Sequence, residues 1–142
     1  MLKTKEAILG LNDKKIEKVF VEPWNDEVCI RVLSGRERDA FEISFMVEKK
    51  KQGDEEIEPL MAKKAVMSNF RARLVSLCLC DEEGIPLFTE ADAKLLGQKS
   101  GVALDIIATA AKKLNGITKE DEKKILKNSE STPEEDSTSD SV

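Results

Sequence analysis

The side chains in this sequence that could perform chemistry are first of all its three cysteines, Cys29, Cys78 and Cys80. Histidine and tyrosine are both absent, so the commonest general base and the most frequent metal ligand are missing. A cysteine nucleophile would therefore lack its usual activating base. Three thiols alone also cannot complete a four-ligand zinc site. The sequence thus indicates a protein without a catalytic, metal or cofactor site.

The positions of the cysteines agree with this reading. Cys78 and Cys80 are two residues apart in a predicted helix, where they would point about 200° apart and could not share one ion. An odd number of cysteines and no recognisable signal peptide are typical of a reduced, cytosolic chain with buried structural thiols. No glycine-rich phosphate loop occurs, and acidic pairs such as Glu55 and Glu56 read as a solvated face.

Charge is distributed unevenly over the 142 residues, of which 40% are hydrophobic and 36% charged. All 23 lysines and arginines precede Ser129, and the last fourteen residues hold five acids and no base, which leaves the body neutral. A neutral body offers no basic surface for nucleic acid, and no apolar run reaches the roughly 20 residues of a membrane span. We expect one domain over residues 1–128 and a disordered acidic tail over residues 129–142.

The first third of the chain predicts a β-hairpin between two helices. Thr4 can cap a short helix over residues 5–9, and runs rich in β-branched residues predict strands over 18–22 and 28–33, joined by a turn. Ser34 and Glu37 have the spacing of a capping box. The helix that they start should run to about Lys51 and be followed by a polar loop over 52–59.

The remainder of the body predicts further helices. A helix over residues 60–80 carries a buried stripe at three- and four-residue spacing, made of Ala62, Val66, Phe70, Leu74 and Leu77. Capped helices should follow over 90–96, 101–115 and 119–128. The predicted class is α+β, mostly α, with the N-terminal hairpin packed on a small bundle of about four to five helices.

Seven short motifs, in order, resemble the tail assembly chaperones of long-tailed bacteriophages and prophages. They cover most of residues 4–116, and the stretch from 47 to 64 and the acidic tail depart from the pattern. The motifs are Val-Glu-Pro-Trp (21–24), Arg-Val-Leu-Ser-Gly-Arg-Glu-Arg-Asp-Ala-Phe-Glu (31–42), Arg-Ala-Arg-Leu-Val (71–75), Asp-Glu-Glu-Gly (81–84), Leu-Phe-Thr-Glu-Ala-Asp (87–92), Leu-Gly-Gln-Lys-Ser (96–100) and Lys-Leu-Asn-Gly (113–116).

The resemblance implies a non-catalytic protein of the host bacterial cytoplasm that is absent from the mature virion. Such chaperones bind the tape measure protein, keep that long helical chain soluble, and recruit tail tube subunits. In many relatives a longer form arises by ribosomal frameshifting. The resemblance also admits self-association. It implies interaction surfaces in place of catalytic residues.

The residues themselves offer four candidates for contact with a partner. Trp24, at the hairpin turn, is the strongest, since an exposed tryptophan often anchors an interface, although it could equally fold back over the hairpin. Met46, Met61 and Met67 could form an adaptable surface or fill gaps in the core. The alternatives for function are a small structural tail or head-completion protein retained in the virion, and a helical regulator of a transcription protein.

Overall fold

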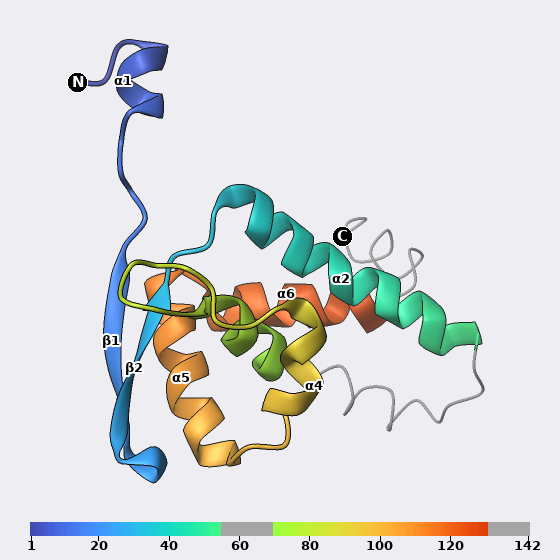
Figure 1. The fold of residues 1–142 in the computed structure, drawn as a ribbon. Helices are drawn as coiled ribbons and strands as arrows, with labels where there is room; N and C mark the ends of the chain where they lie inside the picture. Colours follow the sequence, from blue (N-terminus) through green and yellow to red (C-terminus); the bar gives the residue numbers. More distant parts are fainter. Residues whose placement is uncertain (55–69, 131–142) are drawn as a thin grey trace.

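The computed structural model describes residues 1–54 and 70–130, with side chains described except at 46–54 and 128–130. A small antiparallel sheet lies on one side and helices cover one of its faces (Figure 1). The fold is therefore α+β and mostly α, as the sequence predicted. None of the helices within the described ranges is long and apolar enough to cross a bilayer.

The hairpin consists of β1 (Ile16–Val21) and β2 (Asp26–Arg31). A single 3₁₀ turn, η1 (Glu22–Trp24), connects them, and Asn25 closes it with a left-handed backbone at φ 49°. Asparagine tolerates this conformation better than most residues. Both strands begin two residues earlier than the sequence predicted, and β2 starts directly after Asn25.

The sheet has a third strand, and here the sequence prediction was wrong. We expected the helix after residue 60 to continue to Cys80, but the helical segment of residues 70–78 gives way to β3 (Leu79–Cys80). β3 pairs with β2, so that Cys29 lies opposite Cys80. On its other side Asp81 N donates to Ile85 O at 2.9 Å and Leu87 N to Leu79 O at 3.1 Å. The second bond satisfies the carbonyl group of Leu79, which is buried.

The helices are α1 (Lys5–Leu9), α2 (Gly35–Asp54), α4 (Ala93–Leu96), α5 (Gly101–Leu114) and α6 (Lys119–Glu130), with the 3₁₀ turn η2 (Glu90–Asp92) before α4. α2 includes Gln52–Asp54, which we had assigned to a loop; the rest of that loop and the start of the following helix lie outside the described residues. The predicted caps are confirmed by side-chain bonds at Thr4, Ser34, Thr89, Ser100 and Thr118.

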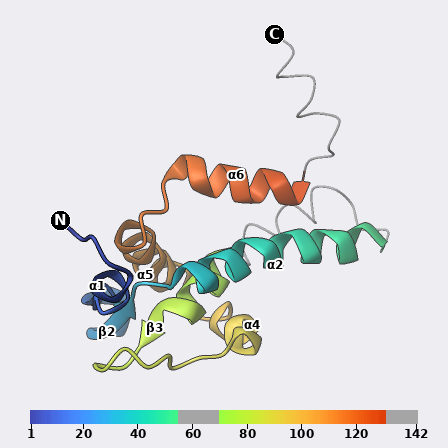
Figure 2. The same ribbon diagram turned by 90° about the horizontal axis from the view of Figure 1, so that it is seen from above.

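The core lies between the sheet, α2, α5 and the segment 70–78. Its largest fully buried side chains include Phe45, Phe70, Ile30, Leu74 and Leu104. Val21 and Ile30 contribute from the inner face of the hairpin, against which α5 packs (Figure 1). α6 lies alongside α2 (Figure 2) and is held by Ile125, which is 5% exposed. In contrast α1 projects from the body and buries no residue.

Candidate partner-binding groove

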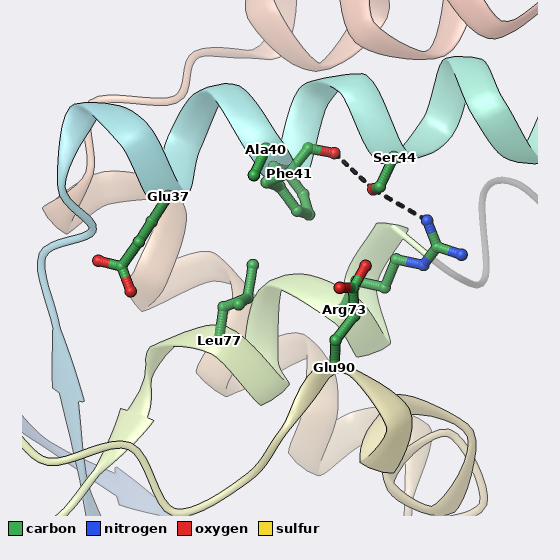
Figure 3. Close-up of a pocket in the computed structure, with 7 residues that line it drawn as sticks. All are labelled: Glu37, Ala40, Phe41, Ser44, Arg73, Leu77 and Glu90. Carbon is green, nitrogen blue, oxygen red and sulfur yellow. Dashed lines mark hydrogen bonds between the residues drawn. The ribbon is translucent and has the colours of Figure 1, made fainter.

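A pocket of about 120 Å³ opens between α2 and the helical segment 70–78, with η2 at its edge (Figure 3). Phe41 points down from α2 and Leu77 points up from the opposite segment, so that the lining is mostly apolar. Ligand pockets usually measure about 300–1,000 Å³. The groove is therefore too small for a cofactor and matches the size of an inserted side chain.

Aromatic packing fixes the depth of this groove. Phe41, Phe45 and Phe70 form a cluster with ring centroids 5.0–5.4 Å apart. Phe41 is only 3% exposed and its ring forms the floor. Pairs of this geometry add about 0.5–1.5 kcal/mol beyond the burial of their surface, so the floor is a rigid surface.

A polar bridge closes one end of the groove. Arg73 Nη1 donates to Ser44 Oγ at 2.9 Å, and Ser44 Oγ donates in turn to Phe41 O at 2.6 Å (Figure 3). The Arg73 guanidinium also lies 5.1 Å from the centre of the Phe45 ring. Glu90 approaches from η2 and is exposed. Glu37 also lines the groove, which thus combines an apolar floor with one basic and two acidic side chains among its described residues.

The start of α2 is anchored to the sheet by an ion pair. Both Arg31 terminal nitrogens donate to Glu37, at 2.9 and 2.8 Å, and Ser34 N donates to the same carboxylate at 2.9 Å. The bond to Arg31 is the main reason that the pKa of Glu37 falls from 4.5 to about 2. The Arg31 side chain is 9% exposed, so the carboxylate compensates a cation that is almost fully removed from water.

Asn115, just after α5, connects the end of the hairpin and the start of α2 to the last turn of α5. Its Oδ1 accepts from Leu33 N at 2.7 Å, and its Nδ2 donates to Ala111 O at 2.9 Å. Its carbonyl oxygen accepts from Arg38 Nη1 at 2.9 Å. Asn115 therefore joins the end of the hairpin, the first turn of α2 and the last turn of α5, and it holds one wall of the groove in position.

Of the four residues proposed from the sequence, only Trp24 has a described side chain, and it does not line this groove. Trp24 is half-buried at η1 and packs against the core cluster, which leaves part of the ring in solvent. Met46 lies on α2 beyond the last side chain described, and Met61 and Met67 lie outside the described residues.

Sequence reasoning missed the groove itself. Leu77 was expected in the buried stripe of the helix over residues 60–80, but it is half-buried and lines the groove. Ser44, Arg73 and Glu90 carried no signal of their own. They lie on three different segments of the chain, and these segments come together only in the folded protein.

The cysteines show no sign of activation. Cys78 is fully buried, and burial raises the pKa of its thiol to about 12; burial also raises the pKa of Cys80. A thiol is nucleophilic only as the thiolate, so neither residue is reactive at neutral pH. Among the residues that the structure describes, no three histidine, cysteine or acidic side chains gather closely enough to hold a metal ion.

Comparison with known proteins gives one match. The family model described as phage tail assembly chaperone matches residues 5–125, which is most of the chain and includes β1, β2, β3 and the described lining of the groove. No curated protein and no solved structure matches significantly.

Proposed function

The chain belongs to the phage tail assembly chaperone family, and from that premise we propose that it binds the tape measure protein, keeps it soluble and recruits tail tube subunits. Membership of the family supports this proposal, since it gives the chain a role in phage tail assembly. We further propose that it acts in the host cytoplasm and leaves before the virion is complete.

The groove beside α2 supports a specific mode of binding. A long helical client presents apolar side chains at every third or fourth residue, and such a helix binds by laying this stripe into an apolar groove. Phe41 and Leu77 provide the apolar contact, and Arg73 and Glu90 provide charges at the rim. We assign one apolar client side chain to the groove, because its volume of about 120 Å³ holds little more.

Trp24 remains part of the proposal as a second contact. Its ring is half-buried, so a partner could cover the remaining surface, and η1 lies against α5. Met46, Met61 and Met67 stay candidates for the same reason as before: flexible thioether side chains adapt to varied apolar partners.

Co-expression with the tape measure protein encoded beside this chain tests the proposal. The tape measure protein should be soluble and co-purify with the wild type, and Leu77→Asp should weaken the co-purification by placing a charge at the mouth of the groove. Ile43→Asp is the matched control, since Ile43 is an apolar residue on α2 that is 55% exposed and does not line the groove.

Three results would redirect the proposal. If Ile43→Asp weakens co-purification as much as Leu77→Asp does, the groove is not the contact. If only Trp24→Ala weakens it, the hairpin turn is the contact. If the wild type neither solubilises nor retains the tape measure protein and is found by mass spectrometry in purified virions, the chain is a structural component of the particle.

A further inference from the structure

One edge of the sheet has no partner within the described chain. Val32 N donates to Lys15 O at 3.0 Å, and in an antiparallel ladder hydrogen-bonded pairs alternate with non-bonded pairs. By this register, the residues of β1 whose backbone groups bond β2 are Glu17, Val19 and Val21. The N–H and C=O groups of Ile16, Lys18 and Phe20 point away from β2, and no described residue bonds them.

The side chains beside this free edge form an alternating row. Because successive side chains of a strand point to opposite faces, Lys14, Ile16, Lys18 and Phe20 share the outer face, while Val19 and Val21 face the core. Ile16 is 41% and Phe20 55% exposed. Neither Lys14 nor Lys18 forms an ion pair with the residues described.

A polar cavity lies at the start of the same strand. It measures about 240 Å³ and is lined by Lys14, Lys15 and Arg31 against a single acid, Glu83. The Arg31 Nε atom is buried without a hydrogen-bond partner. Arg31 is paired with Glu37, so Lys14 and Lys15 against Glu83 leave an excess of one positive charge. This excess favours a carboxylate as the occupant of the cavity.

We propose that the free edge of β1 binds an extended segment of a partner protein in which acidic and apolar residues alternate at every second position, so that both kinds lie on the same face of the added strand. The backbone of that segment bonds Ile16, Lys18 and Phe20 as a fourth strand. Its apolar side chains lie beside Ile16 and Phe20, and its acidic side chains lie beside Lys14 and Lys18, with one directed at the cavity. This surface is separate from the groove beside α2, so it goes beyond the proposed binding of a helical client.

A second copy of this chain fits the edge less well. Antiparallel pairing of two β1 strands that matches Ile16 with Phe20 sets Lys18 directly opposite Lys18, and like charges in that position are destabilising. Opposite an acidic residue the same lysine is stabilising. The charge on the edge therefore favours an acidic partner strand over another copy.

The probe is the ten-residue peptide Glu-Thr-Val-Thr-Glu-Thr-Val-Thr-Glu-Thr, whose glutamates and valines alternate on one face of a strand. It is added to ¹⁵N-labelled protein and its binding is followed by amide hydrogen exchange. At a peptide concentration of about ten times Kd, exchange at Ile16, Lys18 and Phe20 should slow by about tenfold, since protection follows occupancy. Exchange at Glu17, Val19 and Val21, which already bond β2, should change little. A peptide of the same composition with its glutamates grouped at one end is the control and should give no such protection.

Two variants separate charge from backbone pairing. Lys18→Glu should lose binding of the acidic peptide and gain binding of the same peptide with lysine in place of each glutamate. Lys94→Glu, on the exposed side of α4, should behave as the wild type. Lys18→Pro should abolish binding of both peptides while preserving the hairpin, since the Lys18 N–H points away from β2. The ¹H–¹⁵N correlation spectrum of each variant reports whether the hairpin is intact.

Three outcomes would overturn the proposal. The first is equal binding of the alternating and grouped peptides. The second is binding without protection at Ile16, Lys18 and Phe20. The third is concentration-dependent protection at these amides without peptide, together with a dimer in analytical ultracentrifugation that Lys18→Pro removes, which would assign the edge to a second copy. The test does not involve the tape measure protein, so its failure is distinct from failure of the proposed function.

Discussion

Replacing Glu37 with glutamine should destabilise the protein in a pH-dependent manner. Glu37 accepts three hydrogen bonds, two from Arg31 and one from Ser34 N. Glutamine has nearly the same shape but lacks the charge that compensates Arg31. Because Arg31 is 9% exposed, the variant leaves a nearly buried cation without its counter-ion.

The lowered pKa of Glu37 gives the size of the expected loss in unfolding free energy. One pKa unit is worth about 1.36 kcal/mol, so the fall from 4.5 to about 2 gives an upper bound of about 3.4 kcal/mol. The Glu37 side chain is 34% exposed, so solvent screens the interaction and we expect a loss of about 1–2 kcal/mol at pH 7.

The sign of the pH dependence follows from linkage. The folded protein lowers the pKa of Glu37, so the ion pair contributes fully above the unfolded value of 4.5 and its contribution is lost as the pH falls toward 2. Urea unfolding of wild type and Glu37→Gln should therefore differ by about 1–2 kcal/mol at pH 7 and converge as the pH falls from 4.5 toward 2. A difference that is the same at pH 7 and pH 3, or no difference at pH 7, would refute the reasoning.

Three further predictions address the core, the tail and the thiols. Leu74→Ala should cost about 2–5 kcal/mol in denaturant unfolding, because Leu74 is 0% exposed; a loss below about 1 kcal/mol would contradict its place in the core. Deleting residues 131–142, which are rich in acids and poor in apolar residues, should change the melting temperature by less than about 2 °C, and a larger drop would show that they contact the body. Iodoacetamide at pH 8 should modify half-buried Cys29 before Cys78 in the folded protein, because burial raises the pKa of Cys78 to about 12; mass spectrometry showing Cys78 modified first would contradict this.

Local signals in the sequence correctly predicted the helix starts that lie within the described residues. A capping side chain bonds an amide within three residues, so its effect depends little on the rest of the fold. The capping box at Ser34 and Glu37 is an example, since both reciprocal bonds form. The hairpin was also predicted, although its turn closes earlier because Asn25 adopts a left-handed backbone.

The third strand and the groove could not be predicted in this way. Residues 74–80 are almost uniformly apolar, and such a run fits a buried helix and a buried strand equally well. Pairing of Cys80 with Cys29, distant in sequence, decides the conformation. The groove depends on how α2 lies over the segment 70–78, which is set by packing of Phe41, Phe45 and Phe70. No local sequence pattern specifies the separation between α2 and the segment 70–78.

The solubility of the tape measure protein tests the central claim most directly. The measurement is the soluble fraction of that protein after expression alone, with the wild-type chain, and with Leu77→Asp. The account predicts that it is largely insoluble alone, largely soluble with the wild type, and intermediate or insoluble with the variant. A soluble fraction that does not change when the wild-type chain is present would contradict the claim that this chain is its chaperone.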